Sequence, residues 1–258
     1  MNAASDLVDL QQTLYSSKNP TRQWLHCTRR DWIIDALRRY VHEKVDTTLE
    51  VGPGYGIYLP VLAQLSANVM ATDIEDAYLN YAAGLRSVHP NISLQIDDIT
   101  DSNLRDGSFD VILCTEVIEH IQESAAALRE MHRLLKPGGV VVLSTPQRYS
   151  PLELAAKIAF VPGIINIVRL VYREPILESG HINLMTERQI TAQLEAAGFR
   201  IRERFKSGVY LPVVAEFTGT LGLRLAQALE SKLRDGPLSG LLWTQYYIAE
   251  AAHHGQKP

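Results

Sequence analysis

The stretch TLEVGPGYG at residues 48–56 decides the fold. TLEV (48–51) combines apolar and β-branched residues in the manner of a short strand, and three glycines follow within five residues. IYLPVLAQL (57–65) then returns to a helical spacing of apolar residues. The stretch therefore predicts a strand, a tight glycine turn and a helix, which together begin a parallel α/β unit.

The same alternation of strand and helix continues to Pro146 and predicts a parallel sheet with helices on both faces. Because each crossover is right-handed, ligands of such a sheet bind at the carboxyl ends of its strands. A helix is expected ahead of the first strand, over 31–44, and an amphipathic helix at 186–199. The further predicted strands are 68–73, 92–98, 109–116, 140–146, 200–207 and 243–251.

The 258 residues suit a single large α/β domain, with no internal repeat and no linker. After Pro146 the strand–helix rhythm gives way to apolar segments interrupted by prolines, which are typical of a lid over a binding site. We expect four parts: a helical lead-in (1–45), a cofactor-binding core (46–147), and two segments that cover the acceptor (148–180 and 209–235).

Composition excludes several classes of function. The net charge of −4 provides no general attraction to phosphate backbones, so nucleic acid is not an expected partner. The two cysteines, Cys27 and Cys114, lie far apart and show neither a disulfide framework nor zinc-ligand spacing, which fits a cytoplasmic location. The first fifteen residues carry acids and no continuous apolar run, so no signal peptide is predicted.

The most apolar segment, 154–172, contains Lys157, Pro162, Gly163 and Arg169. These residues argue against a transmembrane helix, although an amphipathic lid or a peripheral membrane contact would tolerate them.

Acidic residues stand at the ends of four predicted strands: Glu50, Asp73, the Asp97–Asp98 pair and Glu116. In a parallel sheet these ends meet along one edge. A dinucleotide would bring a pyrophosphate that this acidic edge repels, whereas a ligand with cationic groups and hydroxyls would find partners there. S-adenosylmethionine, with its sulfonium, amine and ribose hydroxyls, fits that description. The alternatives are a purely structural glycine turn and solvated loop acids.

Asp73 follows the glycine turn by about twenty residues, the distance at which an acid accepts hydrogen bonds from both ribose hydroxyls. The competing interpretation of Asp73 is a helix cap. Ile74 comes next and is included in the predicted cofactor site. Asp98 with Ile99 would offer a carboxylate and an apolar edge to adenine.

Several motifs in order carry a resemblance to a known family. They are LEVGPGYG, ATDIED, QIDDI, FDVILCTEVIEHI and LLKPGGVVVLSTP, which together cover residues 45–147, and HINLMTERQITAQLEAAGF at 181–199 extends the match. The chain resembles the class I S-adenosylmethionine-dependent methyltransferases of the ubiquinone-biosynthesis and sterol-methyltransferase-like superfamily, with a type 11 methyltransferase domain.

The resemblance implies a Rossmann-like sheet of seven mostly parallel strands, the last of them antiparallel. It implies that Gly52, Gly54 and Gly56 lie against the methionine part of the cofactor, with Asp73 at the ribose and Asp98 near adenine. Related enzymes often bind the cofactor carboxylate with a basic residue that precedes the first strand. Here that residue is Arg29 or Arg30, unless the pair is merely solvated.

Methyl transfer from a sulfonium is an in-line displacement that depends mainly on holding the acceptor atom close and aligned. If the acceptor is a hydroxyl, as we expect, a nearby base helps to remove its proton. His120 and His181 are the candidates because both follow strand ends that form the pocket. For each, the alternative is a neutral histidine with a structural hydrogen bond.

Glu116, Glu119 and His120 resemble the E-x-x-E-H that binds a divalent ion in some ubiquinone-pathway O-methyltransferases. At a helix start the three side chains would share a face, and their oxygen-rich set would favour magnesium. Many relatives carry similar residues without metal, so no metal ligand is assigned from the sequence.

Tyr149 and the apolar stretches 150–178 and 209–225 indicate a small-molecule or lipid-like acceptor, unless the lid merely packs on the core. The sequence leaves the oligomeric state open. Two other functions fit the same fold: a non-catalytic partner subunit that binds S-adenosylmethionine, and, with less support from the acidic edge, a nicotinamide-dependent oxidoreductase.

Overall fold

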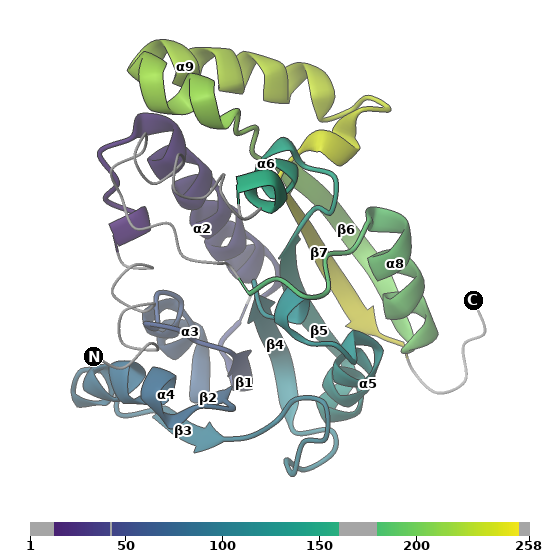
Figure 1. The fold of residues 1–258 in the computed structure, drawn as a ribbon. Coiled ribbons are helices and arrows are strands. Elements are labelled where there is room, and N and C mark those ends of the chain that lie inside the picture. Colours follow the sequence, from purple (N-terminus) through teal and green to yellow (C-terminus); the bar gives the residue numbers. More distant parts are fainter. Residues whose placement is uncertain (1–12, 42, 160–179, 253–258) are drawn as a thin grey trace.

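The computed structural model describes residues 13–41, 43–159 and 180–252. In these ranges the chain forms a seven-stranded sheet of order β3-β2-β1-β4-β5-β7-β6 (Figure 1). Neighbouring strands pair in parallel from β3 to β5, whereas β7 is antiparallel to both β5 and β6. The predicted seven-stranded, mostly parallel sheet with an antiparallel last strand is confirmed. The strands are β1 (Val45–Val51), β2 (Ser66–Asp73), β3 (Ile92–Ile96), β4 (Phe109–Thr115), β5 (Leu135–Pro146), β6 (Phe199–Ser207) and β7 (Thr244–Ala251).

Helices cover both faces of the sheet, as the predicted α/β class requires. In Figure 1, α2, α3 and α4 lie on one face, and α5 and α8 lie on the other. Short 3-10 turns complete the connections: η1 (Gly84–Ser87), η2 (Ile118–His120) and η3 (Ser239–Leu241). The helices are α2 (Pro20–Tyr40), α3 (Leu59–Leu65), α4 (Asp76–Ala83), α5 (Ser124–Leu134), α6 (Pro151–Ala159), α8 (Glu187–Ala196) and α9 (Pro212–Leu233).

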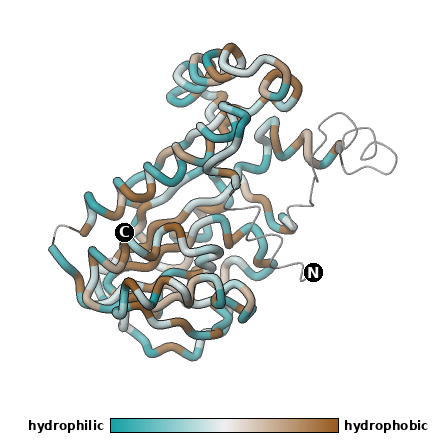
Figure 2. Tube along the Cα trace, turned by 90° about the vertical axis from the view of Figure 1, so that its left-hand side faces the viewer, coloured by the Kyte–Doolittle hydropathy of each residue, from teal (hydrophilic) through white to brown (hydrophobic). Residues whose placement is uncertain are grey.

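The central strand β4 shows how the two cores are filled. Its residues Val111 and Leu113 pack with α2 and α3, whereas Ile112 and Cys114 pack with α5 and α8. Successive side chains of a strand point to opposite faces, so a strand covered on both faces is apolar throughout. Figure 2 shows the same pattern, with hydrophobic segments gathered in the centre and helices that alternate between hydrophobic and hydrophilic residues.

The lead-in helix differs from its prediction at both ends. It runs from Pro20 to Tyr40, whereas the apolar spacing predicted 31–44. The start is set by local chemistry, because the Asn19 side chain accepts hydrogen bonds from two backbone amides of the first turn and Pro20 is preorganised for helix. An Asn-Pro start carries no apolar periodicity, so the pattern of apolar residues missed it.

The second predicted acceptor segment is helical and lies against α2. Asn19 Nδ2 donates to the Ala215 carbonyl at 3.1 Å, and Arg22 pairs with Glu216 at 2.6 Å. Of the first segment, α6 is described, and the remainder of the predicted lid, 160–179, lies outside the described residues. Within the part of the chain that the structure describes, no helix is both long and apolar enough to span a membrane.

We expect Ile112→Ala to lower the free energy of unfolding by roughly 2–5 kcal/mol, because it leaves a cavity at a fully buried position of the central strand. Ile96→Ala is the matched control on edge strand β3, where the side chain is 58% exposed, and it should change stability by no more than about 0.5 kcal/mol. Urea unfolding followed by circular dichroism measures both. Equal effects would contradict this account of the core.

Candidate active site

The site lies where the chain order of the sheet reverses. From β1 the chain proceeds outward through β2 and β3 on one side, and it then returns to β4 on the other. The loops that leave the carboxyl ends of β1 and β4 therefore diverge, and such a point is where ligands of open α/β sheets bind. We call this edge of the sheet the carboxyl edge.

The glycine turn after β1 depends on residues without a side chain. Gly52 has a φ of 67°, and a Cβ built there would lie 2.5 Å from Val117 Cγ2. Gly56 has a φ of 82°, and its Cβ would lie 2.8 Å from Leu85 Cδ1. Gly54 also has a positive φ. The turn thus brings backbone close to the space above β1, which a ligand can approach.

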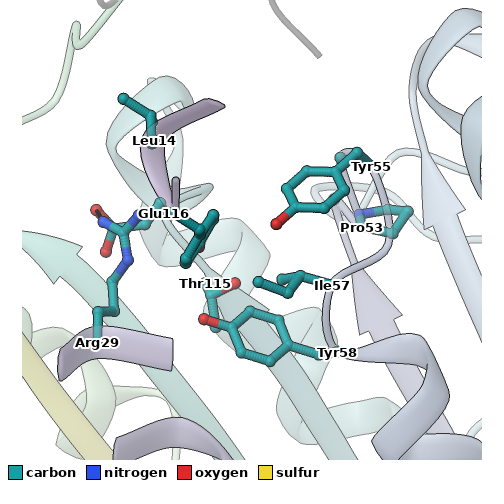
Figure 3. Close-up of a pocket in the computed structure, with 11 residues that line it drawn as sticks. Leu14, Arg29, Pro53, Tyr55, Ile57, Tyr58, Thr115 and Glu116 are labelled. Carbon is teal, nitrogen blue, oxygen red and sulfur yellow. Dashed lines mark hydrogen bonds and ion pairs between the residues drawn. The ribbon is translucent and has the colours of Figure 1, made fainter. Parts of the chain in front are cut away.

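A cavity of about 100 Å³ opens between this turn and the end of β4 (Figure 3). A pocket for a complete nucleoside ligand usually measures roughly 300–1,000 Å³, so this cavity suits one end of such a ligand. In Figure 3 the hydroxyls of Tyr55 and Tyr58 point toward the space that Arg29 and Glu116 bound on the opposite side. The lining residues are Leu14, Tyr15, Arg29, Gly52, Pro53, Gly54, Tyr55, Ile57, Tyr58, Thr115 and Glu116.

Next to the glycine turn, the buried atoms Glu50 Oε2 and Tyr58 Oη have no hydrogen-bond partner among the described residues. Burial raises the pKa of Glu50 to about 8. Polar atoms without a hydrogen-bond partner in a protein interior are unfavourable unless a ligand or a water molecule supplies that partner. An ammonium group would supply a donor to these oxygens. Tyr58 lines the cavity and Glu50 lies behind it, so the predicted role of Glu50 in cofactor binding stays a prediction.

The predicted ribose and adenine residues lie next along the carboxyl edge, after β2 and β3. The Asp73 carboxylate is half-buried and accepts a hydrogen bond from the Glu75 amide at 3.0 Å, and burial raises its pKa. The N-cap of α4 is Glu75, so Asp73 does not cap that helix. Ile74 is largely exposed beside it.

Asp98 is exposed and accepts hydrogen bonds from the amide and hydroxyl of Thr100 at 2.8 and 2.7 Å. Ile99 is buried in the core, so the apolar edge expected there is partly used for packing. Its neighbour Asp97 is buried as well and accepts from Ser102 and Asn103. Asp98 is therefore the acid of the pair that remains accessible to a ligand.

The two candidate arginines have different surroundings. Arg29 lines the cavity, and its Nη1 donates to Glu116 Oε2 at 2.5 Å. Arg30 pairs instead with Asp31 at 2.7 Å. Of the two, Arg29 is the one placed to meet a ligand carboxylate.

Glu116 is held more tightly than the sequence suggested. Its φ is 55°, a left-handed conformation that a side chain rarely adopts. The carboxylate accepts from Arg29 and, at 2.8 Å, from the Ser144 hydroxyl. Strained residues with several partners concentrate at functional sites.

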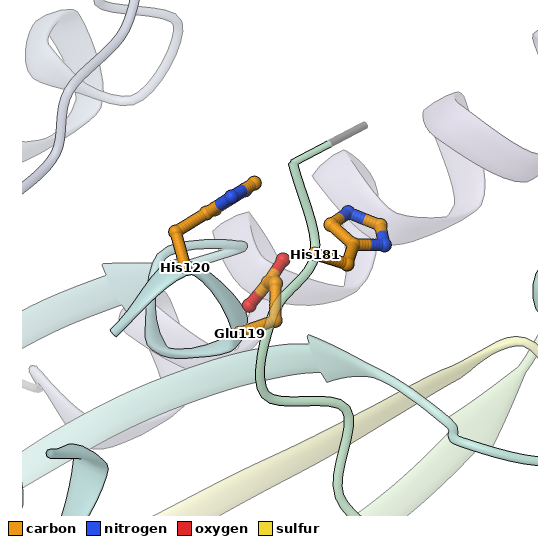
Figure 4. Close-up of side chains that lie close together, drawn as sticks. All are labelled: Glu119, His120 and His181. Atoms are coloured by element: carbon orange, nitrogen blue, oxygen red, sulfur yellow. The ribbon is translucent and has the colours of Figure 1, made fainter. Parts of the chain in front are cut away.

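Both candidate histidines lie in one cluster with Glu119. Figure 4 shows the Glu119 carboxylate between the two imidazoles, and the ligating atoms of Glu119, His120 and His181 all lie within 4.8 Å of one another. Burial, and then the neighbouring His181, lower the pKa of His120. Burial, and then the charge of Glu116, raise the pKa of Glu119.

The E-x-x-E-H pattern does not assemble as its spacing suggested. Glu119 and His120 lie in η2, but Glu116 turns away to Arg29 and Ser144. His181 takes the third position, from a segment distant in the sequence. The three residues of the motif therefore do not share a face.

Comparison with known proteins identifies the family. A family model described as a methyltransferase domain matches residues 24–204, which is most of the chain. The chain belongs to the methyltransferase-domain family. Membership confirms the predicted class I resemblance, the enzyme class and S-adenosylmethionine as the methyl donor, and it leaves the nicotinamide alternative without support.

The chain is also similar to two named relatives and to one solved structure. It is 28% identical over 206 residues to a Mycolicibacterium smegmatis protein named "Probable S-adenosylmethionine-dependent methyltransferase", covering 79% of this chain and 69% of that protein. It is 37% identical over 115 residues to the ubiquinone biosynthesis O-methyltransferase of Pseudomonas paraeruginosa, covering 43% of this chain and 49% of the relative. An Aquifex aeolicus S-adenosylmethionine-dependent methyltransferase has the same fold, with a TM-score of 0.59, 17% identity, and 98% and 100% of the two chains covered.

Some residues of this methyltransferase site were not found from the sequence. Tyr55 and Tyr58 stand within and just after the glycine turn, so their position was a usable signal. Leu14 and Tyr15 close the cavity from the lead-in, and no motif marks them. No residue of α6 or α9 lines this cavity, so the covering role of 148–180 and 209–235 stays a prediction.

The stability of this methyltransferase should depend on pH through Glu50. Between its ordinary pKa of 4.5 and the folded value of about 8, the unfolded carboxyl ionises while the folded one keeps its proton. Over that range the free energy of unfolding falls as pH rises, by up to about 1.4 kcal/mol per pH unit from this group. Glu50→Gln should remove that component, so wild type loses stability relative to the variant as pH rises.

Urea unfolding of ligand-free protein at several values between about pH 5 and pH 8 measures the difference between the two proteins. Stability curves that run parallel in wild type and Glu50→Gln would show that Glu50 is ionised in the folded protein.

Proposed function

We propose that this methyltransferase transfers the methyl group of S-adenosylmethionine to a hydroxyl oxygen of a small or amphipathic molecule. The observation that carries the proposal is the cluster of Glu119, His120 and His181. Glu119 and His120 follow the cavity residue Glu116 along the same loop, and His181 joins them from a distant segment. Ser144 and Thr145, adjacent residues of β5, hold Glu116 and Glu119 respectively. A donor site and a group of proton acceptors thus stand side by side at the carboxyl edge.

The donor would lie along this edge from β4 to β3. Its methionine end occupies the cavity, against the turn of Gly52, Gly54 and Gly56, with its carboxylate toward Arg29 and its ammonium toward the unpartnered atoms of the interior. Its ribose reaches Asp73 beside Ile74. The positions of these residues and the chemistry of each part of the donor support these proposed roles.

Adenine would then lie by Asp98 and Ile99, after β3. The exposed Asp98 carboxylate would accept a hydrogen bond from the adenine amine, and Ile99 supports the loop from the core side. Such an arrangement leaves the sulfonium methyl near the end of β4, facing the histidine cluster.

In the transfer step the acceptor oxygen attacks the methyl carbon in line with the bond to sulfur. The carbon–sulfur bond breaks, its electron pair stays on sulfur, and S-adenosylhomocysteine leaves as the neutral thioether. The hydroxyl proton passes to the cluster, where His120 and His181 are the predicted catalytic residues. Most of the acceleration comes from holding oxygen, methyl and sulfur aligned.

Two observations support an amphipathic acceptor with a hydroxyl. Several relatives are named ubiquinone biosynthesis O-methyltransferases, although the chain spans about half the length of the Pseudomonas proteins. The predicted acceptor segments also expose apolar side chains, among them Tyr149, Leu154 and Ile158.

Cys27 and Cys114 are free thiols, which supports the proposed cytoplasmic location.

Asp73→Ala should weaken S-adenosylhomocysteine binding by roughly 10- to 100-fold, because it removes charge-assisted hydrogen bonds to the ribose. Isothermal titration calorimetry measures the affinity. Asp35→Ala, an exposed carboxylate on α2, is the control and should stay within about twofold of wild type. An unchanged affinity in Asp73→Ala would refute the ribose assignment.

His120→Ala and His181→Ala should each lower turnover by roughly 10²- to 10⁴-fold and leave S-adenosylhomocysteine affinity unchanged, because they act on the acceptor and not on the donor. A labelled-methyl screen of quinols, hydroxylated lipids and sugars identifies the acceptor, and mass spectrometry locates the methyl group. His89→Ala is the control. Methyl on nitrogen or carbon would overturn the hydroxyl proposal, and tight donor binding without turnover on any acceptor would favour the non-catalytic subunit.

A further inference from the structure

We propose that Glu119, His120 and His181 form a binding site for a divalent transition-metal ion, with Zn²⁺ as the best match. The ligand set differs from the E-x-x-E-H pattern, because His181 replaces Glu116 and nitrogen replaces oxygen. Ion binding itself does not depend on the proposed function. Only the catalytic use of the ion rests on that proposal.

The backbone brings the three side chains together. The amides of Ile182 and Asn183 both donate to the Glu119 carbonyl, at 3.0 and 2.9 Å. These bonds fix the segment after Gly180 against η2, so His181 is held beside Glu119 and His120. Among the described residues, these three are the one group of histidine, cysteine or acidic side chains with ligating atoms close enough to share an ion.

Each imidazole is oriented by a partner outside the cluster. His120 Nδ1 lies 3.1 Å from the Gly180 carbonyl, and His181 Nδ1 lies 3.0 Å from Glu153 Oε2. A carbonyl or carboxylate in that position accepts the Nδ1 proton, which leaves Nε2 of each ring with its lone pair. Metal-binding histidines are held in the same way, by a carbonyl or carboxylate on the other ring nitrogen.

Glu119 provides an independent sign of a missing ligand. Its side chain is fully buried, and Oε2 accepts from the Thr145 hydroxyl at 3.0 Å. Oε1 is also buried and has no hydrogen-bond partner. A carboxylate oxygen in that situation requires a proton or a cation. The ligating atoms of Glu119 and the two imidazoles lie within 4.8 Å of one another, close enough for the three side chains to share a cation.

The partner of His181 is itself firmly placed. Glu153 is 5% exposed, and its second oxygen accepts from the Trp243 indole at 3.2 Å. Glu153 is therefore a positioning residue, which would act on the ion through His181.

The donor set selects the type of ion. Two imidazole nitrogens and one carboxylate suit Zn²⁺ and its first-row neighbours, whereas Mg²⁺ prefers oxygen ligands in an octahedral arrangement. Ligand atoms about 2.1 Å from a tetrahedral ion lie about 3.4 Å apart. The ligating atoms here lie within 4.8 Å of one another, so they need to move closer together when an ion binds. His120 is exposed on a short turn and can make that movement. Three protein ligands leave one position open toward the acceptor.

A divalent ion held here would lower the pKa of a hydroxyl beside it, as ions of this class do for water. With the ion bound, Nε2 of His120 and of His181 would be ligands, so this effect would take the place of proton transfer to the two imidazoles. The residues of this chain would hold the ion, orient it through Glu153, and leave the open position accessible to the acceptor.

Cobalt(II), a coloured substitute for Zn²⁺, tests the site directly. We expect chelator-treated protein to bind one Co²⁺ with the visible absorption of a four-coordinate ion, displaced by equimolar Zn²⁺ but not by excess Mg²⁺. His181→Ala and Glu119→Gln should abolish the absorption, and Glu153→Gln should weaken binding by roughly 10- to 100-fold. His89→Ala is the control histidine and should bind normally. S-adenosylhomocysteine affinity shows that each variant is folded.

Glu116→Gln discriminates between the two ligand sets. Retained Co²⁺ binding in Glu116→Gln with loss in His181→Ala supports the proposal, and the reverse result overturns it in favour of E-x-x-E-H. No Co²⁺ absorption in folded wild type also overturns it. If chelated protein still methylates a hydroxyl at full rate, the ion has no catalytic role while the proposed function stands. If Co²⁺ binds and no hydroxyl is methylated, the proposed function fails and the site remains.

Discussion

The pairing of β1 with β2 on one side and β4 on the other is the constraint on which the rest of the structure depends. Both pairings are parallel, so three strands end at the same edge. The register aligns Val51 with Thr72 and with Cys114, so the glycine turn, Asp73 and Glu116 all begin from one level. A shift of register would turn buried side chains to the wrong face, and the apolar content of these strands therefore specifies where the glycine turn, Asp73 and Glu116 lie.

The strands and the acids at their ends could be predicted because their signals are local, whereas the role of those acids in donor binding stays a prediction. A buried strand is a continuous apolar run, the glycine turn is visible as spacing, and an acid at a strand end needs no distant partner. The histidine cluster differs. His120 and His181 were each expected near the pocket, but their joint position with Glu119 depends on backbone bonds between η2 and residues some sixty positions away. Glu153 was not predicted, because nothing about an acid in an apolar segment indicates which histidine it will hold.

The ion pair of Arg29 and Glu116 connects the lead-in helix to the end of β4. Both side chains are largely buried, and Arg29 also lies 5.4 Å from the Trp243 ring centre and 3.2 Å from His26 Nδ1. Buried pairs add little net stability compared with apolar packing, but removal of one partner is strongly destabilising. The positive φ of Glu116 is a further cost. A pair of this kind is better explained by its place at the cavity than by stability, since it presents a fixed cation where a ligand carboxylate is expected.

Trp243 connects the two halves of the site. One face of its indole lies beside the Arg29 guanidinium, at the donor cavity, and its Nε1 donates to Glu153, which holds His181 in the acceptor cluster. It stands just before β7, the antiparallel strand inserted beside β5. The cavity beside Arg29 and the cluster around His181 are thus connected through a rigid aromatic side chain, and under the proposed function this contact would fix donor and acceptor relative to each other. In-line transfer requires alignment within a fraction of an ångström, and a short chain of buried contacts maintains such alignment better than a mobile lid does.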